Sequence, residues 1–320
     1  MIEQRATVPT AARPAIVVTP RSLSDGGHPA LDALRDAGFD LRFPAPGRSP
    51  SRAELLAALP GSVGYLAGTE TIDAELIAAA PELRMISRNG IGVDAIDLDA
   101  ADRAGVIVAP APGANSQGVA ELAITLALSA ARRIPWHDAR LSAGGWERSV
   151  GFEVNGKTLG IIGCGQVGRR VATMAIGLGM SVLAFDAYPS PDFDPEGFRW
   201  AERDEVFTAA DIVTLHAPPS PAGPLVDAER LAEMRSGAVL INTARASLVD
   251  LDAVLAALER GKLGHYATDV FETEPPAPHP LWSHESVTMT PHLGGYTGES
   301  IDRAAYAAVD NLLRELSPRR

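Results

Sequence analysis

The chain lacks several features that would assign it to particular classes of protein. Cys164 is its only cysteine, which excludes an intramolecular disulfide and fits a reducing compartment. No uncharged apolar run approaches the roughly 18 residues that a membrane-spanning helix needs. The opening residues, MIEQRATVPTAARPA, lack the apolar core of a signal peptide. We therefore expect a cytoplasmic protein with no membrane partner, and we expect its first dozen residues to be mobile.

Basic residues are also scarce relative to acidic ones. The chain has 28 Lys and Arg against 40 Asp and Glu, a net charge of −12. So acidic a protein disfavours nucleic acid and anionic membrane surfaces as general partners. What the chain does contain is 46% hydrophobic and 21% charged residues, a composition typical of globular proteins. Its 320 residues are enough for about two domains.

Short apolar runs alternate with helical patterns in the first third of the chain. Ser51 and Glu54 have the spacing of a capping box, which predicts the start of a helix over 51–59. Such alternation of strands and helices predicts a parallel sheet with helices on both faces. The expected strands are 15–18, 41–43, 63–67, 84–87 and 106–109.

A second alternating unit begins near Lys157, after a break at PAPGAN (110–115). The stretch 116–133 predicts a long helix that is apolar nearly all round and therefore buried. The tail 299–316 predicts a helix that packs back on the first domain. The fold class is thus α/β, with two doubly wound domains. The expected strands of the second unit are 158–163, 181–186, 211–216, 238–243, 264–270 and 287–291.

The stretch LGIIGCGQVG (159–168) contains three glycines in the pattern G-x-G-x-x-G. Gly163 would allow the tight turn, Gly165 a close approach of a pyrophosphate, and Gly168 close helix–strand packing. Gln166 and Val167 would open the following helix, whose free N–H groups can bind phosphates. The pattern therefore predicts a dinucleotide site, although ordinary strand–helix turns also contain such glycines.

Asp186 ends the next strand, eighteen residues after Gly168. A carboxylate at this place can accept hydrogen bonds from both ribose hydroxyls and repels a 2′-phosphate. It therefore predicts NAD rather than NADP, against the alternative of a surface aspartate. His216 ends another strand and is expected to line the cofactor site.

Three ionisable residues follow strands of the second unit, where ligands of such sheets bind. Arg245 could bind the carboxylate of a 2-keto acid and polarise its ketone. His292 could give a proton to the new alkoxide, and Glu274 beside it would favour the protonated ring. Each residue alone has an ordinary interpretation as a salt-bridge partner, a loop charge or a strand-end cap. All three after a dinucleotide loop predict a hydride-transfer enzyme.

The chain resembles the D-isomer-specific 2-hydroxyacid dehydrogenases, the family of phosphoglycerate, glycerate/hydroxypyruvate and D-lactate dehydrogenases. The resemblance covers nearly the whole chain after its first residues. The motifs that carry it are RNGIGVDAID (88–97), VAELAITLAL (119–128), GKTLGIIGCGQVGRRVA (156–172), INTARASLVD (241–250), ATDVFETEPP (267–276) and TPHLGG (290–295).

The resemblance implies how the domains are organised. A Rossmann NAD-binding domain over 110–293 would be inserted into a flavodoxin-like substrate domain made of 1–109 plus 294–320. A small-molecule substrate would bind in the cleft between them. The family further implies a homodimer paired through the cofactor domain and the long-helix segment. It leads us to expect none of the regulatory domain that some phosphoglycerate dehydrogenases carry.

The resemblance also implies roles for individual residues. The catalytic residues would be Arg245, Glu274 and His292, and no metal is expected. One departure is Ala246, where the family commonly has glycine after the catalytic arginine. The cofactor would contact Thr243 and Asp269, the latter on the nicotinamide side. The substrate carboxylate would bind to backbone N–H groups of the loop formed by Asn89, Gly90 and Ile91. A distal phosphate would bind to Arg88, which directly precedes this loop.

The sequence thus predicts an oxidoreductase that transfers a hydride between NAD(H) and a small D-2-hydroxy acid or 2-keto acid. The first candidate substrate is 3-phosphoglycerate, because Arg88 suits a second anionic group. A glyoxylate or hydroxypyruvate reductase is the alternative enzyme. An NADH-sensing protein like the eukaryotic corepressors of this fold is the alternative of another class.

Overall fold

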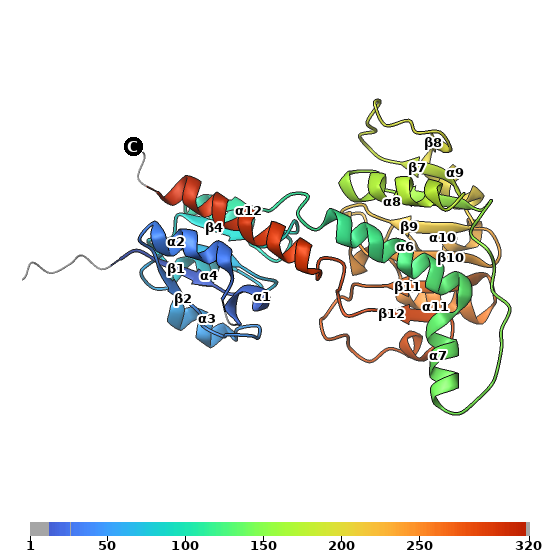
Figure 1. Ribbon diagram of the computed structural model, residues 1–320, viewed down its shortest axis with the longest axis horizontal. Helices are drawn as coiled ribbons and strands as arrows, with labels where there is room; N and C mark the ends of the chain where they lie inside the picture. Colours follow the sequence, from blue (N-terminus) through green and yellow to red (C-terminus); the bar gives the residue numbers. More distant parts are fainter. Residues whose placement is uncertain (1–12, 26, 318–320) are drawn as a thin grey trace, which may run out of the picture. The chain divides into compact units, whose positions relative to one another are not determined.

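A computed structural model describes residues 13–25 and 27–317, which form two compact units (Figure 1). Unit 1 comprises Met1–Asn115 and Gly298–Arg320, and unit 2 comprises Ser116–Thr297. The expected domain boundaries lie a few residues earlier, after 109 and after 293. The expectation of a mobile start falls on 1–12, outside the described residues. None of the helices in the described part of the chain is long and apolar enough to cross a membrane.

Unit 1 is built on a five-stranded sheet in the order β2-β1-β3-β4-β5, with all neighbouring strands parallel. This order is that of the flavodoxin-like fold, as the sequence predicts. The strands are β1 (Ala15–Val18), β2 (Asp40–Arg42), β3 (Ser62–Ala67), β4 (Met85–Arg88) and β5 (Ile107–Ala109). The helices are α1 (Arg21–Ser24), η1 (Pro29–Leu31), α2 (Asp32–Asp36), α3 (Arg52–Ala58), α4 (Ala74–Ala78), α5 (Leu98–Arg103) and α12 (Gly298–Leu316).

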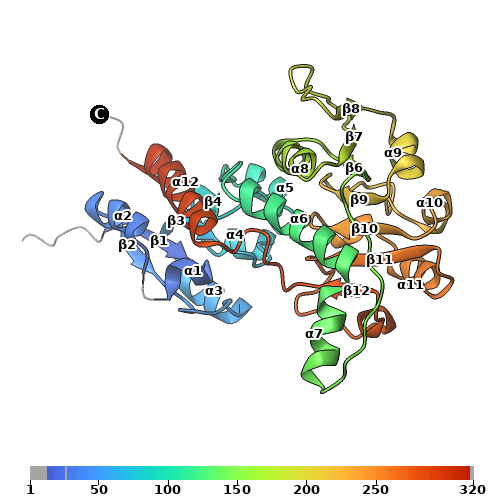
Figure 2. The same ribbon diagram turned by 45° about the vertical axis from the view of Figure 1, so that its right-hand side comes forward.

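The C-terminal helix α12 completes unit 1. It packs against β3 and β4, with Leu312 fully buried among residues from the first strands and helices (Figure 2). At Gly64 of β3 an added Cβ would come 2.7 Å from Leu316, so only glycine lets the helix approach this closely. The prediction that the tail helix packs on the first domain is confirmed. The capping box is confirmed as well, since Ser51 and Glu54 exchange the two expected contacts.

Unit 2 is built on a seven-stranded parallel sheet in the order β12-β11-β10-β9-β6-β7-β8. The direction of winding reverses between β6 and β9, which is the switch point of a Rossmann sheet. The strands are β6 (Thr158–Ile162), β7 (Ser181–Phe185), β8 (Phe198–Trp200), β9 (Ile212–Leu215), β10 (Ala238–Asn242), β11 (Leu263–Thr268) and β12 (Val287–Met289). The helices are α6 (Ser116–Arg132), α7 (Ile134–Ser142), α8 (Gln166–Gly177), α9 (Arg203–Ala209), α10 (Ala228–Glu233), α11 (Leu251–Glu259) and the short η2 (Ala246–Leu248) and η3 (Pro280–Ser283).

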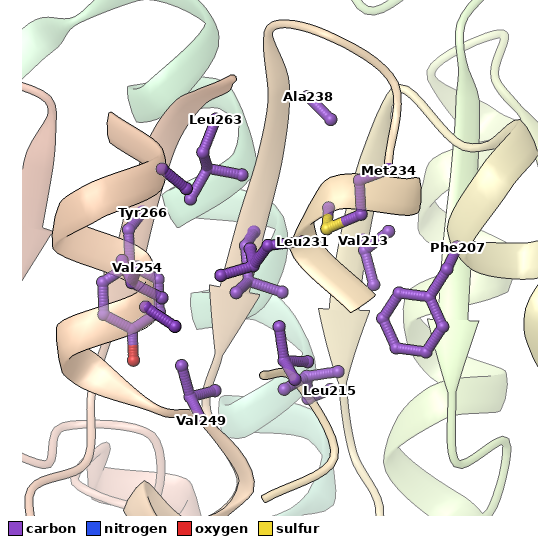
Figure 3. Close-up of a cluster of buried hydrophobic side chains, with 14 of the residues drawn as sticks. Phe207, Val213, Leu215, Leu231, Met234, Ala238, Val249, Val254, Leu263 and Tyr266 are labelled. Atoms are coloured by element: carbon purple, nitrogen blue, oxygen red, sulfur yellow. The ribbon is translucent and has the colours of Figure 1, made fainter. Parts of the chain in front are cut away.

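Two hydrophobic cores cover the two faces of this sheet. Helices α6 and α8 pack on one face, and α9, α10 and α11 pack on the other (Figure 1). Figure 3 shows the second core, where Phe207, Leu231 and Val254 from the helices meet buried strand residues. The predicted fold class, two doubly wound α/β domains, is confirmed. Strand β8 was not predicted, because three residues at a sheet edge are too short to show an alternating pattern.

Helix α6 corrects one prediction: in the single chain it is buried on one face only. The buried face consists mainly of small residues that let the helix lie close to α8 and the sheet. Outward-facing Glu121, Thr125 and Leu128 are exposed. The exposed apolar side chains continue beyond this helix, into α7 and the segment after it: Leu128, Ile134, Leu141, Trp146 and Val150. A helix that is apolar on nearly every face is therefore not necessarily buried on every face within its own chain.

His265 makes the stability of unit 2 sensitive to acid. Its ring is buried on β11, bonded to Thr288 at 2.9 Å, and burial together with the charge of Arg133 lowers its pKa to about 4. Below pH 6.5, the ordinary pKa of histidine, this ring takes up a proton in the unfolded chain but stays neutral in the folded protein. We expect stability to fall by about 3 kcal/mol as pH drops from the ordinary pKa to the lowered one.

The His265→Asn variant should lose most of this dependence, because asparagine does not titrate. Urea unfolding of both proteins at several pH values in that window measures it. Equal slopes of unfolding free energy against pH in the two proteins would contradict the prediction.

Candidate active site

The glycine loop after β6 has the geometry of a pyrophosphate cradle. Gly163 has φ +91°, and a Cβ added there would come 2.5 Å from the backbone of His216. A Cβ on Gly168 would collide with the carbonyl oxygen of Gly163, whereas one on Gly165 would meet nothing within 4 Å. Two of the glycines are thus required by packing, and the third leaves an open approach for a ligand.

Helix α8 starts directly at this open approach. Gly165 is its N-cap and offers no side-chain hydrogen bond, so the N–H groups of the first turn, from Gln166 and Val167 onward, are not capped by a side chain. Such a helix end favours an anion through its N–H groups and its dipole. The residues present therefore fit the pyrophosphate of a dinucleotide.

Asp186 lies beside the same loop. One carboxylate oxygen accepts a hydrogen bond from the N–H of Cys164 at 2.7 Å, and the other accepts from the N–H of Tyr188 at 2.9 Å. These two bonds fix the carboxylate next to the glycines, where a ribose would lie. The thiol of Cys164 is a poor nucleophile, because burial and nearby Asp186 raise its pKa to about 12.

The carboxyl end of β10 carries Thr243 and Arg245. The hydroxyl of Thr243 is buried and has no hydrogen-bond partner among the described residues, which leaves it available to a cofactor. Arg245 is half-buried, and its Nη1 donates to the carbonyl oxygen of Ala244 at 2.7 Å. His216 ends the neighbouring β9 and pairs through Nε2 with Thr214 at 3.0 Å, which suits a lining residue.

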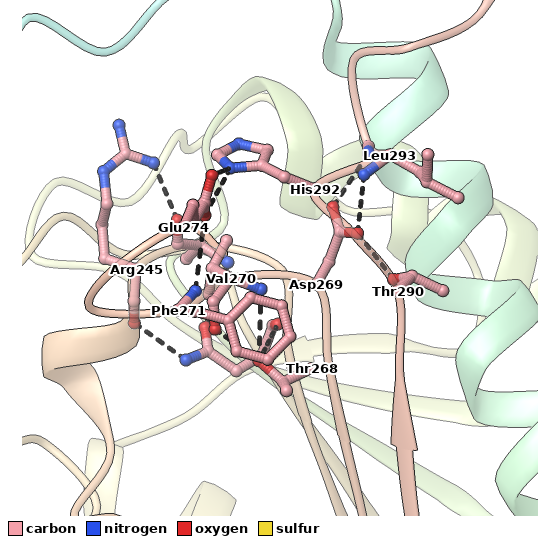
Figure 4. Close-up of polar contacts among 12 residues, drawn as sticks. Arg245, Thr268, Asp269, Val270, Phe271, Glu274, Thr290, His292 and Leu293 are labelled. Carbon is pink, nitrogen blue, oxygen red and sulfur yellow. Dashed lines mark hydrogen bonds and ion pairs between the residues drawn. The ribbon is translucent and has the colours of Figure 1, made fainter. Parts of the chain in front are cut away.

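Glu274 and His292 form an ion pair at the same end of the sheet (Figure 4). The imidazole Nδ1 lies 2.8 Å and 3.0 Å from the two carboxylate oxygens of Glu274. The paired Nδ1 leaves Nε2 as the ring atom that can exchange a proton with a ligand. The structure therefore brings the two residues together as the sequence analysis requires, with Arg245 gathered near them in Figure 4.

The backbone at His292 is strained and held in place by Asp269. His292 has φ +54°, a left-handed conformation that costs about 1–2 kcal/mol outside glycine. The carboxylate of Asp269 accepts hydrogen bonds from the N–H groups of Leu293 at 2.7 Å and Gly294 at 2.8 Å. It also accepts one from the hydroxyl of Thr290 at 2.6 Å. Asp269 is almost completely buried, so it secures the histidine turn as well as flanking the predicted cofactor site.

The predicted substrate loop of unit 1 follows β4. The N–H of Asn89 donates to the carbonyl oxygen of Ala67 at 2.9 Å, which ties the loop to the end of β3. Gly90 has φ +152°, and a Cβ there would press on Arg88, whose Nη1 donates to the carbonyl oxygen of Asn89 at 2.8 Å. The side-chain oxygen of Asn89 is buried without a partner among the described residues, and Ile91 is exposed.

Sequence reasoning missed a carboxylate that follows the neighbouring strand β3. Glu70 follows β3 at the switch point between β1 and β3, where ligands of a flavodoxin-like sheet bind. One of its oxygens accepts hydrogen bonds from the hydroxyls of Thr19 and Tyr65, the latter at 2.8 Å. The same oxygen accepts a third from the N–H of Gly68 at 3.0 Å. Only the strand order, which sequence alone does not show, places this residue at the switch point of the sheet.

Comparison with known proteins identifies the family. Residues 124–294 match the family model described as D-isomer specific 2-hydroxyacid dehydrogenase, NAD binding domain. This match covers more than half of the chain. The chain belongs to the D-isomer-specific 2-hydroxyacid dehydrogenases. The predicted family and its NAD-binding domain are thereby confirmed.

Individual members of the family resemble the chain over most of its length. D-3-phosphoglycerate dehydrogenase of Mycobacterium tuberculosis (strain ATCC 25618 / H37Rv) is 41% identical over 261 residues, which are 80% of this chain and 49% of that protein. The chain therefore spans about half the length of the curated relatives it matches. The solved structure of the TT0316 protein from Thermus thermophilus is 36% identical, with a TM-score of 0.87 over 96% of this chain and 98% of that one. A glyoxylate reductase described as from Paecilomyes thermophila is 28% identical, with a TM-score of 0.83 over 94% of both chains.

Proposed function

We propose that this dehydrogenase transfers a hydride between NAD(H) and a small D-2-hydroxy acid or its 2-keto acid. The observation that carries the proposal is the Glu274–His292 ion pair, with Nδ1 and the carboxylate 2.8 Å apart at the carboxyl edge of a Rossmann sheet. The paired histidine lies close to Arg245, and the same sheet carries a glycine loop that fits a pyrophosphate. This combination suits the reduction of a ketone.

The residues of the chain have distinct tasks in this reaction. Bound NADH would supply the hydride. Arg245 would bind the substrate carboxylate and stabilise the negative charge that develops on the keto oxygen. His292 would donate the proton from Nε2 to that oxygen, and would take it back in the reverse direction. Glu274 keeps the ring oriented through its contact with Nδ1.

Two substrate classes remain distinct proposals. Arg88 over the Asn89–Gly90 backbone supports a substrate with a distal phosphate, such as 3-phosphoglycerate. The second class is a tail without a phosphate, as in glyoxylate or hydroxypyruvate. The glyoxylate reductase neighbour agrees with the second class.

A panel of 2-keto acids tests the proposal. The loss of NADH absorbance should be steady with at least one of glyoxylate, hydroxypyruvate, pyruvate and 3-phosphohydroxypyruvate. The substrate with the highest kcat/KM assigns the class of tail. NADH binding without turnover on any of them would instead favour the NADH-sensing protein and would overturn the enzyme.

We also propose that the protein is a homodimer. Five large apolar side chains are exposed on α6, α7 and the segment after them, and Val150 and Trp146 are 97% and 84% exposed. Exposed apolar side chains in such number on one stretch of chain suit a contact with a second copy of the chain. Sedimentation equilibrium should give twice the chain mass, and a monomer at micromolar concentration would contradict the dimer.

Asp186 should decide the choice between NAD and NADP. Its carboxylate is held at the glycine loop by two backbone N–H groups, so it cannot move away from a 2′-phosphate without losing them. We expect Asp186→Ser to lower the ratio of kcat/KM for NADH over NADPH by about 10–10²-fold, since like-charge repulsion costs a few kcal/mol. The exposed Asp192→Ser is the matched control. A parent enzyme that prefers NADPH would show that this carboxylate does not select the cofactor.

A further inference from the structure

Asn242 ends β10 and bonds through its side chain to the turn that carries Arg245. The residue is completely buried. Its Nδ2 donates to the carbonyl oxygen of Arg245 at 2.8 Å, and its Oδ1 accepts from the N–H of Ala244 at 3.1 Å. These two contacts need a side chain that donates with one atom and accepts with another. The amide of asparagine can do both, whereas an ionised carboxylate can only accept. The backbone on both sides of the Ala244–Arg245 peptide is thus fixed by one side chain.

The main chain of the same residue holds the segment that leads to His292. The carbonyl oxygen of Asn242 accepts hydrogen bonds from the N–H of Asp269 at 3.0 Å and from the hydroxyl of Thr268 at 3.3 Å. Asp269 in turn binds the two N–H groups that follow His292. A single buried residue therefore joins the backbone of Arg245 to Asp269, which holds the turn of His292.

We propose that Asn242 is a positioning residue that sets the guanidinium of Arg245 relative to the imidazole of His292. This inference rests on the proposed function, in which the first group binds the carboxylate and the second moves the proton. Both must meet one small substrate, and a displacement of about 1 Å can cost 10²-fold in rate. Asn242 itself does not reach the reacting atoms, because its side chain is consumed by backbone contacts.

The Asn242→Asp variant tests this directly. It keeps the size and the acceptor but turns the donor into an oxygen that faces the carbonyl of Arg245. We expect kcat/KM for the 2-keto acid to fall by about 10–10²-fold, with a higher KM and a larger isotope effect from deuterated NADH. The Kd for NADH should stay unchanged. Neither the isotope effect nor KM depends on what fraction of the enzyme is folded and active. A variant that merely folds less well would therefore leave the isotope effect and KM unchanged.

Two further variants separate positioning from general stability. Thr288→Val removes a buried hydrogen bond to His265 elsewhere on the sheet, and should lower the melting temperature without changing KM or the isotope effect. Asn242→Ala, which buries no charge, should reproduce the pattern of Asn242→Asp if that variant does not fold. In the Arg245→Lys background, Asn242→Asp should lower kcat/KM by a smaller factor than it does in the parent protein. Equal factors in both backgrounds would overturn the proposal.

Hydrogen exchange gives a readout that does not need turnover. Amides in 243–248 should exchange faster in Asn242→Asp than in the parent protein, because this segment loses its side-chain anchor. Amides in 290–294 should keep their exchange rates, because the main-chain carbonyl of residue 242 still accepts from Asp269. If the parent protein reduces no 2-keto acid, the proposed function fails while this measurement still tests the anchor. Unchanged exchange in 243–248 would overturn the anchor itself.

Discussion

Replacement of His292 by alanine should lower kcat for keto-acid reduction by about 10²–10⁴-fold, the usual contribution of general acid–base catalysis. The ring nitrogen Nδ1 is engaged by Glu274 at 2.8 Å, so the proton that the product needs has to come from Nε2. Without the ring, water would have to deliver this proton. The Kd for NADH should change little, and stopped-flow reduction of the best 2-keto acid measures the chemical step.

Glu274→Gln provides the companion measurement. The amide keeps the shape but cannot accept at both oxygens from Nδ1, so the ring is held less firmly and reduction should slow. In the His292→Ala background the same change should cost almost nothing, because the two residues act as one unit. If His292→Ala keeps a near-normal kcat, the proton donor is another group and the mechanism proposed above fails.

Arg245→Lys should lower kcat/KM for the 2-keto acid by about 10²–10³-fold, the loss seen when one donor to a developing oxyanion is removed. The guanidinium offers a planar fork that can bind a carboxylate while one nitrogen remains bonded to Ala244 at 2.7 Å. An ammonium at the end of a flexible chain cannot make both contacts with fixed geometry. The loss should appear both as a raised KM, because carboxylate binding is weakened, and as a lowered kcat, because polarisation of the ketone is lost.

Arg230→Lys is the matched control for this change. Arg230 lies on α10 of the same unit and is largely buried. It forms ion pairs with Glu233 of its own helix and with Asp204 of α9. Its replacement should leave KM and kcat unchanged. Steady-state kinetics on the two variants decide the assignment: similar effects at both positions would show that arginine geometry at β10 has no special part in the reaction.

Local patterns predicted the architecture well because the strands of a parallel sheet are buried on both faces. Nearly continuous apolar runs such as 158–162 and 238–242 could therefore be identified, and each of the expected strands is present in the structure. Predictions failed where burial depends on what lies opposite. Helix α6 is apolar nearly all round, yet one face is exposed, because the sheet can cover only one side of it. The edge strand β8, three residues long, carried too little pattern to be seen.

The sequence by itself determined the family, the glycine loop and the residue types of the site. The pattern of Gly163, Gly165 and Gly168 is local in sequence. A side chain at Gly163 or Gly168 would collide with backbone of the same loop or of the adjacent strand end, and Gly165 leaves an open approach. Residues at strand ends, such as Arg245 and His292, could be chosen as candidates because carboxyl ends of parallel strands share one edge.

Only the tertiary structure decided how these candidates act together. The contact between Glu274 and His292 spans 18 residues of chain, and the bond from Asn242 to Asp269 joins two different strands. Such distances depend on strand order and register, which arise when the whole sheet forms. Asn242 and Glu70 were missed because each is an ordinary polar residue in the sequence. Their long-range contacts, from Asp269 to the carbonyl of Asn242 and from Thr19 to Glu70, exist only once neighbouring strands have paired.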